Sequence, residues 1–212
     1  MIEVIPVTSK TVKPWLLSKH YARRMCPISY AFGAYRKGHL IGIITYGTPA
    51  SAPLRSGICG PTYAKYVLEL NRLCCDSEKN LASIIVGKSL KQLPQPSIVV
   101  SYADTAQGHV GYVYQATNFL YTGLSAKRTD WTIKGREHLH GATVADESRG
   151  QPNRAAWMRA KYGDAFYLKP RPRKHRYVFF VASSTQRKSL LKALRYPVTP
   201  YPKGESLRYS IN

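Results

Sequence analysis

The feature that most restricts the fold of this chain is a short apolar run, Ile98-Val99-Val100. A polar loop follows it. Three consecutive β-branched residues are typical of a strand covered on both faces, because a half-exposed strand alternates apolar and polar residues. From His109 onward, apolar residues recur at steps of three and four, which predicts a helix that ends at Gly123. The sequence therefore predicts an α/β fold with an inner strand, a polar loop and a helix.

The loop between this strand and this helix is the first candidate site. The carboxyl end of an inner strand here carries the hydroxyl of Ser101, the carboxylate of Asp104 and the imidazole of His109. Gly108 lies in the same loop. Open α/β sheets bind ligands at that end. In a purely structural alternative, Asp104 or Thr105 accepts hydrogen bonds from amides at the start of the helix. Both interpretations stay open at this point.

The remaining elements follow from apolar periodicity and from capping and turn residues. Strands are expected over residues 2–7, 28–36, 39–47, 65–75, 97–101 and 177–182, and residues 124–135 are expected to form another strand or a hairpin. Helices are expected over residues 9–21, 81–93, 109–123, 154–162 and 184–195. Residues 48–61 and 136–152 are expected to be loops. The first is long enough to be a substrate lid or a DNA-facing segment, with an inert loop as the equal alternative.

This order of elements resembles the GNAT acyltransferase layout, in which a mixed sheet with helices on both faces splays open between its fourth and fifth strands. Residues 65–75 and 97–101 would be those two strands. The resemblance implies a GNAT-like catalytic domain over residues 1–180, with residues 181–212 as a basic C-terminal helix and tail packed on it. It also implies that a tyrosine of the following helix, Tyr114 or Tyr112, acts as an acid.

Positive charge dominates the composition, since 32 Lys and Arg stand against 11 Asp and Glu, for a net charge of +21. A polyanion is the expected partner, and the interleaving of basic residues with Tyr, Trp and His favours nucleic acid over a membrane. The densest basic run covers residues 169–176, although such a run can also be merely solvated. The candidate phosphate-binding residues are Lys169, Arg171, Arg173, Lys174, Arg176 and Arg154.

The four cysteines have no zinc-ligand spacing, which predicts a reducing compartment. Residues 1–10 have no signal-peptide pattern, and no apolar run reaches the length of a membrane span, so we expect a soluble, cytoplasmic protein without a membrane partner. His138 and His140 lack a third ligand at a convincing spacing and are expected to be loop histidines rather than a metal site.

Three motifs together resemble the Mom family of phage DNA adenine modification proteins. They are the His20-Tyr21 pair, ELNRL at residues 69–73, and SYADTAQGHVGYVYQATNFLYTG from Ser101. The likeness spans roughly residues 10–180. It implies conversion of the exocyclic amine of adenine in double-stranded DNA to a carbamoylmethyl derivative, which shields phage DNA from host restriction. Residue by residue, it points to His20, Tyr21, Arg72, Asp104 and Tyr114.

The resemblance suggests roles for these groups. Asp104 or His109 would act as base or orienter, Tyr114 as an acid toward the leaving group, and Arg72 as an anion or donor contact. Because the target amine is paired inside the duplex, the adenine would be flipped into an aromatic pocket. The candidates for stacking are Tyr46, Tyr66, Trp131 and Trp157, with core packing as the alternative for each.

The donor is the least determined part of the site. GNAT enzymes bind the CoA pyrophosphate at a glycine-containing loop before a helix, whereas this segment reads DSEKNLASIIVG. Acyl transfer also makes an amide, whereas carbamoylmethyl is joined through a methylene carbon. One alternative to acetyl-CoA as the donor is glycine activated on tRNA. Another alternative is metal-assisted chemistry, with iron bound by His20, Asp104 and His109. The candidate donor-binding residues are Asn80, Ser83, Gly108 and Gly111. A conventional GNAT acetyltransferase acting on a small molecule or protein, or a noncatalytic DNA-binding protein, are the alternative functions.

Overall fold

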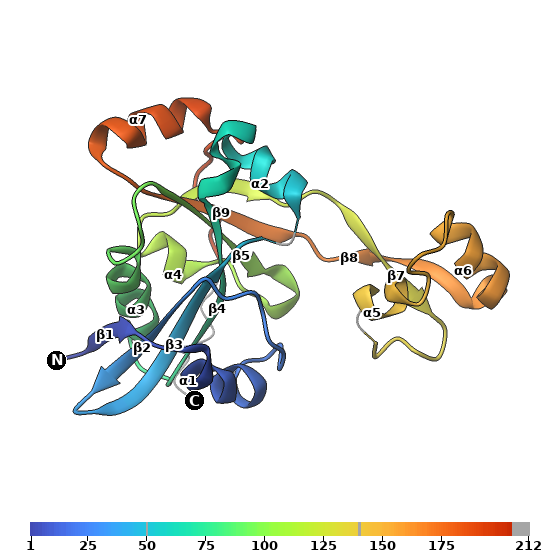
Figure 1. The fold of residues 1–212 in the computed structure, drawn as a ribbon, viewed down its shortest axis with the longest axis horizontal. Coiled ribbons are helices and arrows are strands. Elements are labelled where there is room, and N and C mark those ends of the chain that lie inside the picture. Colours follow the sequence, from blue (N-terminus) through green and yellow to red (C-terminus); the bar gives the residue numbers. More distant parts are fainter. Residues whose placement is uncertain (50, 140, 205–212) are drawn as a thin grey trace. The chain divides into compact units, whose positions relative to one another are not determined.

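A seven-stranded mixed sheet forms the larger part of the fold, with strand order β1-β2-β3-β4-β5-β9-β6 (Figure 1). The computed structural model describes residues 1–49, 51–139 and 141–204. The strands of this sheet are β1 (Glu3–Pro6), β2 (Tyr30–Arg36), β3 (His39–Gly47), β4 (Val67–Cys75), β5 (Ser97–Asp104), β6 (Leu120–Leu124) and β9 (Lys174–Val181). Strands β1 to β4 are antiparallel, β4 and β5 are parallel, and β6 and β9 are antiparallel. The predicted mixed sheet is confirmed.

The predicted hairpin is also confirmed, because β2 and β3 are joined by Lys37 and Gly38 alone. Both turn residues have positive φ, +47° and +78° respectively. Two consecutive residues with positive φ are typical of the type I′ turn, whose twist matches that of the strands it joins.

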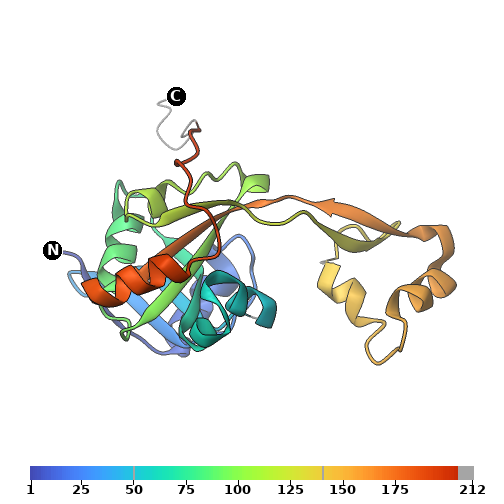
Figure 2. The ribbon, with the colours of Figure 1, turned by 90° about the horizontal axis from the view of Figure 1, so that it is seen from above.

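Helices cover both faces of the sheet (Figure 2). They are α1 (Ser9–Pro14), which continues as the π-helical turn η1 (Trp15–Lys19), α2 (Ala52–Cys59), α3 (Leu81–Leu90), α4 (Tyr112–Gln115) and α7 (Ser184–Ala193). One apolar cluster packs α3 and α4 against the sheet. A second cluster packs α2 and α7 against it, and a third packs α1 and η1. The expected layers are therefore present.

Strand β5 shows why the sequence folds this way. Ile98, Val99 and Val100 are all fully buried. Ile98 and Val100 pack in the cluster of α2 and α7, whereas Val99 packs in the cluster of α3 and α4, as the alternation of side chains along a strand requires. The predicted inner strand, covered on both faces, is confirmed.

A second compact unit, residues Ser125–Lys174, is separate from the first, which comprises Met1–Leu124 and His175–Asn212. This unit 2 holds the two-stranded ribbon β7 (Arg128–Ile133) and β8 (Phe166–Arg171), with α5 (Gly141–Asp146), α6 (Arg154–Tyr162) and the turn η4 (Gly163–Ala165). Its own buried core comprises Ile133, Val144, Met158 and Phe166. The structure thus divides the chain differently from the expected boundary near residue 180.

The helix predicted over residues 109–123 is wrong in length, because α4 is a single turn and β6 follows it. Asn118 has a left-handed φ of +59°, which ends the helical path. The Phe119 amide then donates to the Tyr114 carbonyl, and Leu120 and Tyr121 pair with β9. Apolar residues at helical spacing therefore belong partly to a strand.

Both segments expected to be loops contain a helix. Within residues 48–61, the Ser51 side chain accepts a hydrogen bond from the Leu54 amide and caps α2. Within residues 136–152, α5 buries Val144 in the core of unit 2. A high content of Ser, Pro and Gly concealed the first helix, and a polar composition concealed the second.

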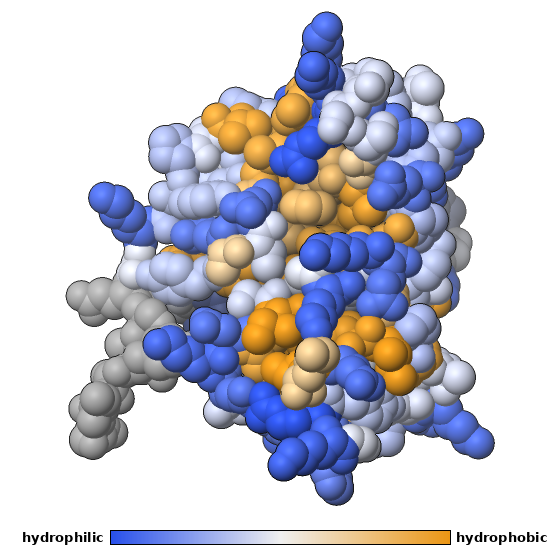
Figure 3. Space-filling model, turned by 90° about the vertical axis from the view of Figure 1, so that its left-hand side faces the viewer, coloured by the Kyte–Doolittle hydropathy of each residue, from blue (hydrophilic) through white to orange (hydrophobic). Residues whose placement is uncertain are grey.

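The surface mixes apolar and hydrophilic side chains. Figure 3 shows one face on which small hydrophobic areas are interrupted by hydrophilic side chains. Among the described residues, none of the helices combines the length and the apolar character needed to cross a bilayer.

Candidate functional site

The site begins where β4 and β5 stop pairing. Their parallel register comprises Val67–Ile98, Leu68–Val99 and Glu69–Val100, while β4 continues to Cys75 and β5 to Asp104. At the next position, the Ser101 hydroxyl donates to the Leu70 carbonyl at 3.0 Å. A side chain therefore bridges the two strands where they diverge, which is the splay that the layout predicted.

Tyr114 lies against this bridge. Helix α4 places its side chain in the core, where it is 8% exposed, and its hydroxyl is hydrogen-bonded to Ser101. Burial raises the pKa of Tyr114 to about 12, so the phenol keeps its proton at neutral pH. Tyr112, the other predicted acid, is exposed and donates to the Gly204 carbonyl instead.

Two more groups interact electrostatically with the Tyr114 hydroxyl, Tyr21 and Glu69, and both contribute to the raised pKa. Tyr21 is exposed and was predicted. Glu69 is half-buried in β4, and it was not assigned a role from the sequence although it opens the ELNRL motif. Its position in the last residue pair of the parallel register, beside the divergence, is the signal that identifies it.

His20 is buried beside this group, with 7% of its surface exposed, and its ring stacks on Tyr21 with centroids 4.4 Å apart. Burial first, and the nearby positive charge of Arg72 second, lower its pKa to about 4. The imidazole is therefore neutral at pH 7. Its Nδ1 accepts a hydrogen bond from the Ala22 amide at 3.0 Å, so the single ring proton resides on Nε2.

Arg72 brings the positive charge of the site. Its Nη1 donates to the Asn71 carbonyl at 2.6 Å, while its buried Nε has no hydrogen-bond partner among the described residues. A buried guanidinium nitrogen without an acceptor is costly, and an anionic ligand would satisfy it. The Arg72 Nε is therefore a donor that an anion could satisfy, and its role as an anion contact stays a prediction.

Asp104 is the last residue of β5, and the turn that follows connects it to His109. The Asp104 Oδ1 accepts from the Ala106 amide at 3.0 Å and caps the turn η3 (Thr105–Gln107), and the His109 amide donates to the Asp104 carbonyl. The capping alternative for Asp104 is thus confirmed. The His109 side chain is exposed.

The four predicted donor-binding residues lie in two places. Asn80, with a φ of +63°, precedes α3, and the Ser83 hydroxyl donates to its carbonyl at 2.9 Å. Gly108 ends η3 at a φ of +64°, with open space where a side chain would be. Gly111 has a φ of +85°, and a Cβ there would lie 2.5 Å from the Tyr177 ring, so close packing explains this glycine.

Among the residues described, no three His, Cys, Asp or Glu side chains are grouped to hold a metal ion. His20, Asp104 and His109 are therefore not grouped as metal ligands in this structure, and a part for iron stays an untested alternative. His138 is exposed, and His140 lies outside the described residues.

The stacking candidates are mostly core residues. Tyr46 is fully buried and its hydroxyl is 2.7 Å from the Ser89 hydroxyl, which confirms the core alternative for it. Tyr66 is half-buried beneath the Lys65 ammonium, 5.0 Å from the ring centre. Trp131 and Trp157 are half-buried against the core of unit 2.

Comparison with known proteins decides the family. The model of the Mom protein family matches residues 1–203. The chain belongs to the Mom family. A relative from Escherichia phage Mu, named methylcarbamoylase mom, is 30% identical over 206 residues, which cover 92% of this chain and 83% of the relative.

Solved structures with partial similarity are acetyltransferases. An N-acetyltransferase from Staphylococcus aureus Mu50 has 13% identity and a TM-score of 0.44, covering 85% of this chain and 99% of that chain. The ribosomal-protein-S18-alanine N-acetyltransferase from Escherichia coli has 5% identity and a TM-score of 0.46, covering 87% and 96% respectively.

The predicted phosphate-binding residues of this Mom family member differ in how exposed their side chains are to solvent. Lys169 and Arg171 are exposed on β8, and Arg173 and Lys174 are half-buried after it. Arg154 is exposed, and its guanidinium bonds Ser148 and the Ala145 carbonyl within unit 2. These five residues lie in unit 2.

Arg176 is the exception, because it belongs to the other unit and is buried. Its Nε and Nη2 donate to the Thr122 hydroxyl and carbonyl at 2.9 and 2.8 Å. The guanidinium also stacks 3.4 Å above the Tyr196 ring centre. Burial lowers the pKa of Arg176, and its contacts are structural.

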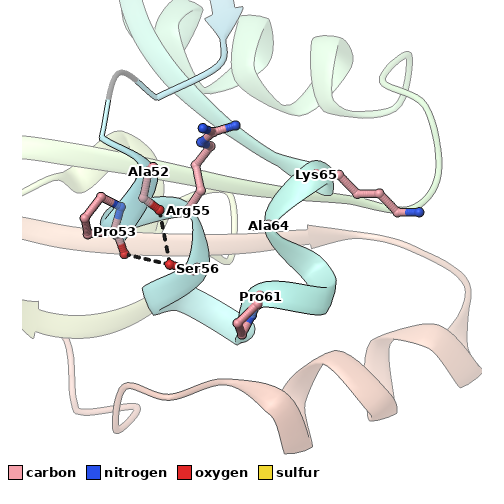
Figure 4. Close-up of a pocket in the computed structure, with 7 residues that line it drawn as sticks. All are labelled: Ala52, Pro53, Arg55, Ser56, Pro61, Ala64 and Lys65. Atoms are coloured by element: carbon pink, nitrogen blue, oxygen red, sulfur yellow. Dashed lines mark hydrogen bonds between the residues drawn. The ribbon is translucent and has the colours of Figure 1, made fainter.

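A separate open depression of about 660 Å³ lies between α2 and the turn η2 (Pro61–Tyr66) (Figure 4). Arg55 and Lys65 are on its wall, and the Ser56 hydroxyl donates to the Ala52 and Pro53 carbonyls at 3.2 and 3.5 Å. The predicted site residues do not line this depression, so it is separate from the cluster around Tyr114.

Proposed function

We propose that this chain is a phage DNA-modifying transferase that converts adenine in double-stranded DNA to its N6-carbamoylmethyl derivative and so protects the DNA from restriction. Membership of the Mom family, with 30% identity to a relative named methylcarbamoylase, is the observation that supports this most strongly. The net charge of +21 suits a DNA substrate. Such an enzyme would act in the cytoplasm of the host cell.

The proposed reaction forms a bond between the amino nitrogen of adenine and a carbon of the donor, and it breaks the bond from that carbon to the leaving group. The amine loses a proton, and the leaving group gains one. Tyr114 suits the second transfer, because a phenol with a pKa of about 12 is protonated when the reaction begins. Ser101 would act as the positioning residue for its hydroxyl.

The neutral His20 would donate a hydrogen bond rather than accept a proton. Its Nδ1 is occupied by the Ala22 amide, which leaves Nε2–H as the group that faces a ligand. A neutral imidazole that donates can polarise a carbonyl without adding a full charge to the site. Arg72, whose Nε lacks a partner among the described residues, would hold an anionic part of the donor.

Removal of the amine proton requires an acceptor. Asp104 and His109 remain candidates, although Asp104 caps its own turn and His109 is exposed. Glu69 is a third candidate, because its carboxylate interacts electrostatically with the Tyr114 hydroxyl at the splay. An acceptor beside the acid would allow both proton transfers in one place.

We infer that the donor is an activated glycine-derived unit rather than acetyl-CoA. Transfer of an acetyl group would give an amide, whereas the proposed product is joined to adenine through a methylene carbon. The leaving group of this donor would be bonded to the methylene carbon. Asn80, just before α3, and Ser83, within its first turn, would contact the donor. The absence of a metal-ligand group among the described residues gives no basis for a step through iron.

The direct test is expression of the full chain in bacteria, followed by digestion of plasmid DNA and mass spectrometry of the nucleosides. We expect a deoxyadenosine that carries one additional carbamoylmethyl group, and none in cells with the empty vector. Unmodified deoxyadenosine, in cells that contain soluble and folded protein, would contradict the proposal. An acetylated deoxyadenosine would contradict the assigned donor.

A further inference from the structure

We propose that the β7–β8 ribbon of unit 2 binds the phosphate backbone of duplex DNA through a cluster of cations at its open end, independently of base sequence. This inference rests on the proposed DNA substrate and assigns a binding element for it. The cluster, called here the ribbon cations, comprises Lys127, Arg128, Arg171 and Arg173.

The ribbon cations surround one open depression. It has a volume of about 560 Å³, and apart from Thr129 and Pro170 its walls consist of these four cationic residues. Lys127, Arg128 and Arg171 are exposed, and Arg173 is half-buried. An open concave surface with four cationic residues matches the requirement for a phosphate, which needs charge and hydrogen-bond donors from several sides.

The strand register places like charges together. Arg128 lies directly opposite Arg171 in the antiparallel pair of β7 and β8. Like charges at directly opposed positions destabilise a sheet, and Asp130, 3.9 Å from the Arg171 Nε, compensates only part of this charge. A bound phosphate would neutralise the remaining repulsion between Arg128 and Arg171. Phosphate binding would therefore explain why two arginines are paired across the ribbon.

Alternation along the ribbon keeps these cations away from the core of unit 2. Trp131, Ile133 and Phe166 pack into that core. Arg128 and Arg171 occupy the opposite face, because opposed residues share a face and successive residues alternate. Arg128 and Arg171 therefore lie on the side of the ribbon away from the apolar core, and both are exposed.

The end of the ribbon that carries these cations is held in place by hydrogen bonds to Ser125. The Arg173 Nε donates to the Ser125 carbonyl at 2.6 Å, the Lys174 amide donates to the Ser125 hydroxyl at 2.9 Å, and the Ser125 amide donates to the Lys174 carbonyl at 2.8 Å. These bonds join the first and last residues of unit 2. The cations thus project from a braced ribbon, which reduces the entropy lost on binding.

Charge is concentrated at this end of unit 2. The unit has twelve Lys and Arg and five Asp and Glu, and several of the acids are paired elsewhere. Glu147 contacts Arg136 and Lys161, and Asp146 contacts Arg149. Long cationic side chains without base-reading geometry contact phosphates, which position a protein on DNA but do not specify sequence.

The test measures binding of fluorescent duplex DNA to the full chain between about 50 and 200 mM salt. In one variant, Lys127→Gln, Arg128→Gln and Arg171→Gln are combined, and Arg173 is retained because it braces the ribbon. Each lost phosphate contact should lower the slope of log affinity against log salt by about one, so we expect a decrease of about three and at least a tenfold loss of affinity at low salt. The loss should be equal for duplexes of unrelated sequence.

The matched control combines Lys10→Gln, Lys91→Gln and Lys192→Gln, which removes the same charge from exposed positions of the first unit. We expect this control to lower the slope by less than about one. The charge-conserving variant with Arg128→Lys and Arg171→Lys should bind nearly as the unaltered chain does. Circular dichroism should show that all three variants are folded.

Equal losses in the two glutamine variants would overturn the proposal, because general charge would then explain binding. An unchanged slope in the ribbon variant, or a ribbon-dependent preference for an RNA hairpin over duplex DNA, would overturn it as well. The assay requires no turnover. Unmodified nucleosides in expressing cells would therefore contradict the proposed reaction and leave the result for the ribbon intact.

Discussion

The cluster around Tyr114 and the ribbon cations of unit 2 hold ionisable groups in opposite ways. Tyr114 and His20 are buried, and desolvation keeps the first protonated and the second neutral. Arg128 and Arg171 are exposed and keep their charges in contact with water. The difference shows that a reaction requires defined protonation states, which burial supplies, whereas adhesion to a polyanion requires charge, which exposure preserves.

The largest expected effect on the difference between the two units comes from disrupting the core of one of them. Met158 is fully buried in unit 2, and Met158→Ala should cost about 2 to 5 kcal/mol through lost apolar contacts and a cavity. Hydrogen exchange should show reduced protection within residues 125–174, while residues 97–104 keep theirs. Equal loss of protection in both segments would show that the two units do not unfold separately.

The pH dependence of stability tests the burial of His20. Its folded pKa of about 4 lies below the ordinary value of 6.5, so the folded state binds this proton less readily than the unfolded state. The associated stability is present above pH 6.5 and is lost as pH falls through 4, by up to about 3 kcal/mol. Urea unfolding of the unaltered chain and His20→Gln should therefore diverge between pH 7 and 4. Parallel profiles would contradict a buried, neutral imidazole.

Two glycines beside the cluster give a matched pair. Gly111→Ala combines a strained positive φ with a clash against Tyr177, and should destabilise the chain by more than about 2 kcal/mol. Gly108→Ala has only the backbone strain, since nothing lies within 4 Å, and should cost about 1 kcal/mol. Thermal unfolding distinguishes them. Equal costs would show that Tyr177 does not determine the residue at position 111.

The smallest expected effect concerns the acid within the ribbon. Asp130→Asn removes a partly exposed ion pair with Arg171, which should change stability by less than about 1 kcal/mol. It also removes a negative charge beside the proposed phosphate site, so duplex affinity should rise about threefold at low salt. Weaker binding by this variant would indicate that Asp130 positions Arg171 for DNA.

Local patterns predicted the parts of the fold that depend on neighbouring residues. The apolar run at Ile98 and the two-residue hairpin turn were both legible, because burial and turn geometry leave direct traces in sequence. The predicted helix over residues 109–123 was too long, because the left-handed Asn118 stops it and no pattern marked that residue. Unit 2 was missed because its few core residues are dispersed within a polar segment.

The residues of the candidate site came from family resemblance, and their arrangement was not predicted. Family resemblance identified His20, Arg72 and Tyr114, and the structure shows His20 beside Arg72 and Tyr114 bonded to Ser101. Glu69 required the strand register to be recognised. Arg176 resembled its basic neighbours in sequence, yet its position in β9 turns it toward Thr122 and into the interior. Long-range pairing determines such placements.

The most direct test of the account is the modified fraction of deoxyadenosine in DNA from cells that express Tyr114→Phe. This variant keeps the buried ring and removes only the hydroxyl that is hydrogen-bonded to Ser101. At matched protein levels, we predict a loss of modification of at least about a hundredfold, with duplex binding by the purified variant unchanged. A modified fraction equal to that of the unaltered chain would contradict the assignment of the chemistry to this buried cluster.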